Sequence, residues 1–144
     1  MKKYSILALR IFLGGVFVYA SIDKILHPAD FAEAVFNYQI LPDMLINLVA
    51  LILPWTELAI GISLIFGIWI HGAVFMANLL LSVFLAALTF NFARGLDIHC
   101  GCFSAKADIT TGASLFWVIL RDIVFFLIGV FLFWQLYFEN RGKN

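Results

Sequence analysis

The chain has 144 residues, of which 64% are hydrophobic and only 12% are charged. A typical soluble domain is about 45–50% apolar and about 25% charged, so this chain has too few polar side chains to cover a water-facing surface. The composition therefore excludes a soluble globular domain and an intrinsically disordered segment. Nine basic residues balance nine acidic ones, so no net charge attracts nucleic acid. We expect a small integral membrane protein surrounded by the lipid bilayer.

Four segments are apolar over about 20 residues, the length that a helix needs to cross a bilayer. They are residues 4–22, 45–68, 72–92 and 115–138. The sequence shows no internal repeat and no linker, and thus predicts an all-α fold: one transmembrane domain over residues 1–144, built as a four-helix bundle. Lys2 and Lys3 before the first apolar run also fit a signal peptide, but the length of that run favours an uncleaved helix.

The positions of the basic residues predict the orientation of the bundle. Lys2 and Lys3 precede the first span, and Arg141 and Lys143 follow the last one, whereas Lys24 is the only basic residue in the first loop. By the positive-inside rule, both termini are expected to be cytoplasmic. The loop between the third and fourth spans, residues 93–114, then faces the periplasm from a bacterial inner (cytoplasmic) membrane.

Two cysteines, Cys100 and Cys102, flank Gly101 in this outward loop, directly after His99. Thiols two positions apart close a disulfide only where the backbone bends sharply, and glycine permits that bend. The resulting ring is strained, and strained, exposed disulfides are labile and oxidising. His99 can activate a neighbouring thiol by its charge or by accepting its proton. The motif predicts a reversible thiol–disulfide couple with Cys100, Cys102 and His99 as its catalytic residues.

Two other interpretations of the motif stay open. The cysteines can be small, half-buried residues that only shape a turn. They can also join His99 as soft ligands for Cu(I) or Zn(II), with His27 as the one further imidazole on the outer side. Two thiolates and one imidazole leave the shell of a structural zinc incomplete, so no metal is expected.

Two ionisable residues in the first half of the chain, Arg10 and Glu57, lie inside predicted spans. Counting about 1.5 Å per helical residue places both at a similar depth in the bilayer. Because a charge in a membrane interior is usually paired, we expect Arg10 and Glu57 to form a structural polar pair. The alternative is that Arg10 extends to the cytoplasmic head groups while Glu57 is protonated.

Three more polar residues, Asn91, Arg121 and Asp122, belong to the outer halves of the last two spans, near the cysteine loop. Adjacent helical residues point in different directions, so only one of Arg121 and Asp122 can face that site directly. The group predicts a cofactor site for a quinone, whose carbonyl oxygens accept hydrogen bonds from Arg121 or Asn91. Alternatively, Arg121 pairs with Asp97 or Asp108 and fixes the loop.

Several spaced motifs carry a family resemblance: Arg10-x-x-Leu13-Gly14-x-x-Phe17, Asp23-Lys24-Ile25, Pro28-x-x-Phe31, Pro54-x-x-Glu57-x-x-x-Gly61-x-x-Leu64-x-x-Gly67 and Cys100-Gly101-Cys102-Phe103. Over nearly its whole length the chain resembles the DoxX-like/MauE family of small four-helix bacterial membrane proteins, and the cysteine motif is most similar to the MauE-like branch. The resemblance implies a redox-associated membrane protein with a thioredoxin-like or disulfide-rich partner. It gives the redox role to Cys100 and Cys102. The Cys-x-x-Cys spacing of thioredoxins is absent.

Together these features favour a membrane thiol–disulfide oxidoreductase. It would exchange electrons between periplasmic thioredoxin-like or substrate protein thiols and membrane quinone. Two alternatives are a non-enzymatic scaffold or assembly factor for a redox protein, and a copper-handling membrane protein. A homo-oligomer is compatible with the sequence.

Overall fold

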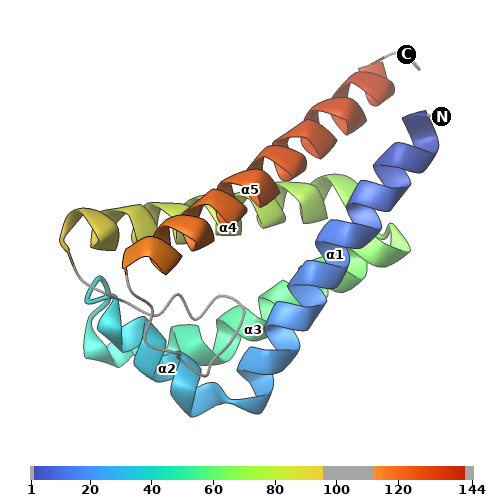
Figure 1. The fold of residues 1–144 in the computed structure, drawn as a ribbon. Coiled ribbons are helices and arrows are strands. Elements are labelled where there is room, and N and C mark those ends of the chain that lie inside the picture. The colour runs from blue at the N-terminus through green and yellow to red at the C-terminus, as the bar shows by residue number, and fades with distance from the viewer. Residues whose placement is uncertain (1, 96–111, 142–144) are drawn as a thin grey trace.

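A computed structural model describes residues 2–95 and 112–141, and it describes side chains over residues 4–95 and 116–138. Within these ranges every regular element is helical, which confirms the predicted all-α class. The helices are α1 (Lys2–Leu26), α2 (Pro28–Asn37), α3 (Asp43–Phe66), α4 (Ile70–Ala93) and α5 (Gly112–Arg141) (Figure 1).

The four long helices match the four predicted spans. The apolar stretches cover Tyr4–Leu26, Asp43–Phe66, Ile70–Ala93 and Phe116–Phe138, with mean hydropathies of 1.9 to 2.3. In the most apolar window of each stretch, at most 28% of the residues are buried inside the protein, so most side chains of the four helices are at least partly exposed and available to contact lipid. The main change in boundaries is at the first span, which continues to Leu26 instead of ending at residue 22.

The short helix α2 is a difference from the prediction, since it lies in the first loop, between the spans predicted at residues 4–22 and 45–68. Pro28 occupies the first helical turn, where its missing N–H costs no hydrogen bond. Phe31 and Ala34, three residues apart, are the buried residues of this helix, which packs on α3. The proline and this apolar spacing were the sequence signals for the helix.

The long helices pack mainly as two pairs, α1 with α3 and α4 with α5 (Figure 1). In the first pair, Gly14 and Gly61 let the two backbones approach closely. A Cβ atom placed on Gly61 would lie 2.8 Å from Val18 Cγ2 and 2.9 Å from the carbonyl oxygen of Gly14. Small residues at such crossings are typical of helix contacts in membranes.

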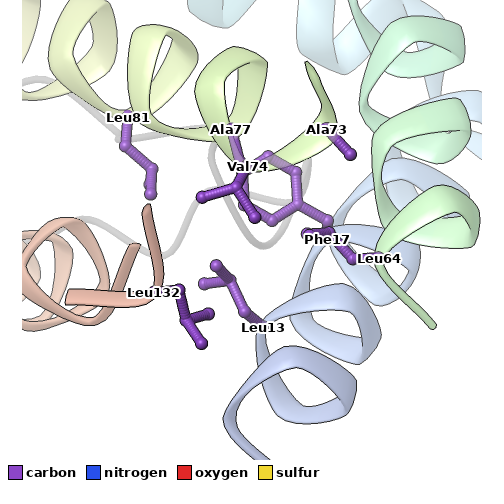
Figure 2. Packing of buried hydrophobic residues seen from close by; sticks show 8 residues of the cluster. All are labelled: Leu13, Phe17, Leu64, Ala73, Val74, Ala77, Leu81 and Leu132. Carbon is purple, nitrogen blue, oxygen red and sulfur yellow. The ribbon is translucent and has the colours of Figure 1, made fainter. Parts of the chain in front are cut away.

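Side chains from all four spans meet in one apolar cluster. Its buried members are Leu13, Phe17, Leu64, Ala73, Val74, Ala77, Leu81 and Leu132 (Figure 2). The cluster joins the two helix pairs. Helix α3 ends at Phe66, at the end of the molecule opposite α2 (Figure 1). Gly67 follows with a left-handed φ of 77°, and the chain turns back into α4.

Candidate functional site: a buried charged cluster

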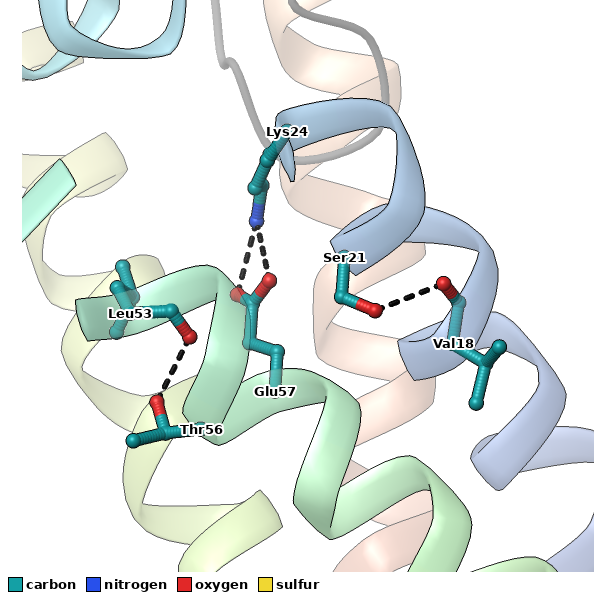
Figure 3. A network of polar contacts seen from close by, with 6 residues as sticks. All are labelled: Val18, Ser21, Lys24, Leu53, Thr56 and Glu57. Atoms are coloured by element: carbon teal, nitrogen blue, oxygen red, sulfur yellow. Dashed lines mark hydrogen bonds and ion pairs between the residues drawn. The ribbon is translucent and has the colours of Figure 1, made fainter. Parts of the chain in front are cut away.

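The centre of the candidate site is an ion pair between α1 and α3. Lys24 lies in the last turn of α1 and Glu57 in the middle of α3. The Lys24 Nζ donates to both Glu57 carboxylate oxygens at 2.8 Å (Figure 3). The two side chains are only 1% and 3% exposed. Removing two charges from solvent carries a large desolvation penalty, and only this close, two-point geometry offsets it.

Two aromatic rings complete the surroundings of the Lys24 ammonium. Its Nζ lies 5.0 Å from the ring centroid of Phe31 and 5.1 Å from that of Phe84. Both distances are within the range in which a ring face attracts a cation. Because Phe31 belongs to α2 and Phe84 to α4, Lys24 is held by groups from α2, α3 and α4. The short helix α2 is therefore part of the site.

The expected pairing of Arg10 with Glu57 is wrong. Arg10 donates instead from Nη2 to the carbonyl oxygen of Ile65 at 3.5 Å, and its guanidinium lies beside Gly67. It thus supplies a positive charge at the C-terminal end of α3, where backbone carbonyls lack helical partners.

The pairing failed because depth was counted along Cα atoms, with the first span ending at residue 22. The helix continues for four more residues, and the long Lys24 stem carries its charge back into the bundle, as lysine stems commonly do. One sequence signal was available. Lys24 is the only lysine or arginine between Arg10 and Arg94.

A second ion pair, within α5, adds another carboxylate. Arg121 donates from Nε and Nη2 to Asp122 Oδ1 at 3.3 and 3.2 Å. The Asp122 side chain is 4% exposed and that of Arg121 is 35% exposed, so Asp122 is the member that faces the interior. The alternative partners Asp97 and Asp108 lie outside the described residues.

Asp122 and the Lys24–Glu57 pair line the same small cavity, together with apolar side chains that include Phe84 and Phe125. Its volume is about 30 Å³, which is room for one or two water molecules. The cluster of Lys24, Glu57, Asp122 and Arg121 balances two cations with two carboxylates. Ionisable groups this deep in a membrane protein are rare and commonly mark a functional site.

Asn91 is buried in the last turn of α4 with 1% exposure. Neither of its amide atoms has a hydrogen-bond partner among the described residues. Asn91 does not line the cavity that Asp122 shares with Lys24. Arg121 does not line it either, so of the three residues predicted for a quinone only Asp122 borders this cavity, and their joint role stays a prediction.

The predicted catalytic residues His99, Cys100 and Cys102 lie outside the described residues. The topology places the helix ends that flank their segment. Helix α4 ends and α5 begins at the end of the bundle where α1 ends and α3 begins (Figure 1). Lys24 lies in the last turn of α1, so the charged cluster extends inward from this same end.

Comparison with known proteins gives a consistent family. The family model described as "Methylamine utilisation protein MauE" matches residues 2–135. The MauE protein of Paracoccus denitrificans is 43% identical over 97 residues, which are 67% of this chain and 52% of that protein. Those of Paracoccus versutus and Methylorubrum extorquens are 39% and 36% identical, over 67% and 65% of this chain and 52% and 51% of their own lengths.

The chain thus spans about half the length of the relatives that it matches. No solved structure matches it. The MauE part of the expected resemblance is confirmed. With the family model covering residues 2–135 and four helices long and apolar enough to span a bilayer, the chain belongs to the MauE family and is a multi-pass membrane protein.

Proposed function

We propose that this chain is a membrane thiol–disulfide oxidoreductase with Cys100 and Cys102 as its redox couple, serving methylamine utilisation as the names of its relatives indicate. One observation carries the proposal. A Cys-Gly-Cys motif stands in the segment between α4 and α5, in a chain of only two cysteines. A disulfide closed over one intervening residue is strained and therefore suited to exchange, whereas it adds little to stability.

The reaction begins with the motif oxidised. A thiolate of a thioredoxin-like or disulfide-rich partner attacks one sulfur, forming a mixed disulfide and releasing the other cysteine as a thiolate. The second partner thiol then attacks the mixed disulfide. The partner loses two electrons and two protons, and the Cys100–Cys102 pair gains both. His99 beside Cys100 favours Cys100 as the activated thiol.

The couple is restored by membrane quinone. The dithiol closes to a disulfide as it gives up two electrons and two protons, and the quinone takes up both to become a quinol. This acceptor suits a protein with four helices long and apolar enough to cross a bilayer, because quinones are dissolved in the bilayer.

We place the motif on the periplasmic side of the inner membrane, with both termini in the cytoplasm. The support is the excess of lysine and arginine in the two tails. On that side, disulfides form and persist. A periplasmic partner can then reach the cysteines without crossing the bilayer.

The redox state of Cys100 and Cys102 in native membranes tests the proposal. Free thiols are tagged with a maleimide that adds mass, with and without added quinone, and with Cys100→Ser and Cys102→Ser as controls that fix the band positions. We expect a reduced pair to become oxidised on adding quinone, and the remaining cysteine of each single variant to stay a free thiol, because neither variant can close the internal disulfide. Thiols that stay reduced under oxidant and quinone, with both variants fully functional in vivo, would leave a scaffold role instead.

A further inference from the structure

A second cavity lies between α2, α3 and α4, next to the charged cluster. Its volume is about 290 Å³ and its lining is almost entirely apolar, including Phe31 and Ala34 of α2, Leu53 of α3, and Phe84 and Ala87 of α4. Ligand pockets in proteins start at roughly 300 Å³. The space therefore suits a small substituted ring and is too small for a whole phospholipid.

The two cavities share one wall. Phe84 lines both the apolar cavity and the charged one, and Phe31 also lines the apolar cavity. These are the two rings that lie about 5 Å from the Lys24 ammonium. The apolar cavity thus ends one ring thickness from a buried cation.

One N–H group of the Lys24 ammonium is not used by Glu57. It carries three N–H groups, and two of them are accounted for by the Glu57 oxygens at 2.8 Å. The third has no oxygen partner among the described residues and lies among the Phe31 and Phe84 rings. Lys24 itself does not line the apolar cavity, so a carbonyl oxygen in that cavity would accept this hydrogen bond when the Phe31 or Phe84 ring turns aside.

The surrounding charges restrict what such a ligand can be. The cluster behind Phe84 pairs two cations, Lys24 and Arg121, with two carboxylates, Glu57 and Asp122. It therefore offers no net charge to hold an anionic head group, such as a fatty-acid carboxylate, or a cation. A neutral, planar ring that bears a carbonyl meets both conditions, and it also stacks favourably against phenyl rings.

We infer that the α2–α3–α4 cavity binds the head ring of a membrane quinone, with one carbonyl oxygen accepting a hydrogen bond from Lys24. This inference deepens the proposed function, on which it rests for the reaction that the quinone serves. It assigns the quinone to a different place from the one expected from the sequence, which was Arg121, Asn91 and Asp122. The unpredicted helix α2 supplies one wall of this site.

The test uses a benzoquinone that carries an azido group and a decyl tail. Protein carrying both Cys100→Ser and Cys102→Ser is placed in phosphatidylcholine nanodiscs, photolabelled over a range of probe concentrations, and mapped by mass spectrometry. We expect saturable labelling on α2 or on the Phe84 region of α4, and competition by unlabelled decyl-benzoquinone.

Neighbouring alanines on α4 provide matched variants. Ala87 lines the cavity, whereas Ala86 is exposed and does not. Phenylalanine at position 87 fills the space that the ring needs, so Ala87→Phe should weaken apparent affinity about tenfold or more. Ala86→Phe should leave the affinity unchanged. If Ala87→Phe loses its unfolding transition, Ala34→Leu fills the same cavity from α2.

Two results would overturn the inference: labelling that does not saturate, or labelling that neither filling variant reduces. Either would mean that the quinone head ring does not bind specifically in this cavity. Because the variant with both cysteines changed to serine has no thiols, its quinone binding is independent of the cysteine chemistry. Binding without thiol cycling in native membranes would contradict only the proposed function, and thiol cycling without binding in the cavity would contradict only this inference.

Discussion

At the scale of single residues, Lys24 is the largest fully buried side chain among the residues that the structure describes. A fully buried lysine is rare, and here it is stabilised by one carboxylate and two ring faces. Replacing a buried ion pair by apolar residues is often neutral for stability or improves it. Stability alone therefore does not explain the pair, which agrees with the ligand-binding role that we infer for Lys24.

The dependence of each charge on the other is testable. Lys24→Met leaves the Glu57 carboxylate buried without its partner, and such changes cost about 3–5 kcal/mol. We expect this variant to unfold at a clearly lower temperature in detergent micelles, monitored by circular dichroism. The Lys24→Met/Glu57→Met double variant should recover most of the loss. A single variant as stable as the parent protein would mean that the two groups are neutral or hydrated.

The individual residues also show where sequence reasoning stops. Glu57 was recognised as a buried charge from its place in an apolar run, but its partner was not, because the choice depended on the reach of the Lys24 stem. Arg10 was expected to be paired and instead lies at the end of α3. The burial of Asp122 over Arg121 was left open, since periodicity alone does not say which face of α5 meets the other helices.

At the scale of elements, hydropathy was enough for the four long helices, since each needs a long apolar run to cross the bilayer. It was not enough for α2. This helix has ten residues and only two buried apolar side chains, so its signal is short and its stability comes from packing on α3. The walls of the apolar cavity depend on that packing, so the cavity could not be predicted from the sequence.

The crossing of α1 and α3 should be sensitive to one methyl group. A Cβ atom at Gly61 would lie 2.9 Å from a backbone oxygen of α1, so Gly61→Ala must push the two helices apart. Gly15→Ala is the control, because a Cβ atom at that position meets nothing within 4 Å. We expect Gly61→Ala to lower the unfolding temperature in micelles and Gly15→Ala to hold or raise it, since alanine favours a helix over glycine by about 0.5–1 kcal/mol.

Equal effects of the two alanine variants would mean that helix propensity outweighs packing at this crossing. If only Gly61→Ala lowers the unfolding temperature, the charged cluster should be affected as well. Gly61 is one turn from Glu57 on α3, so separating the helices there should weaken the Lys24–Glu57 contact. Quinone photolabelling of Gly61→Ala is then expected to fall together with its stability, whereas Gly15→Ala keeps both.

At the scale of the whole molecule, the fold increases the difference in basic residues between the loops and the two tails of the chain. Lys24 is buried against Glu57, so it no longer counts as a basic residue of a loop. The lysines and arginines that then count are Arg94 and Lys106, between the sequences of α4 and α5, against Lys2, Lys3, Arg141 and Lys143 in or beside the two tails of the chain. The positive-inside rule counts such flanking residues, and this distribution supports the proposed orientation with both termini in the cytoplasm.

This orientation is open to direct measurement with a maleimide that does not cross membranes. After mild reduction of intact cells whose outer membrane has been made permeable, Cys100 and Cys102 should be labelled. In protein with both cysteines changed to serine, a reporter introduced by Lys143→Cys should be labelled only after the inner membrane is broken. The reverse pattern would place the couple in the reducing cytoplasm, where a strained disulfide does not persist, and would remove the chemical basis of the proposed oxidation.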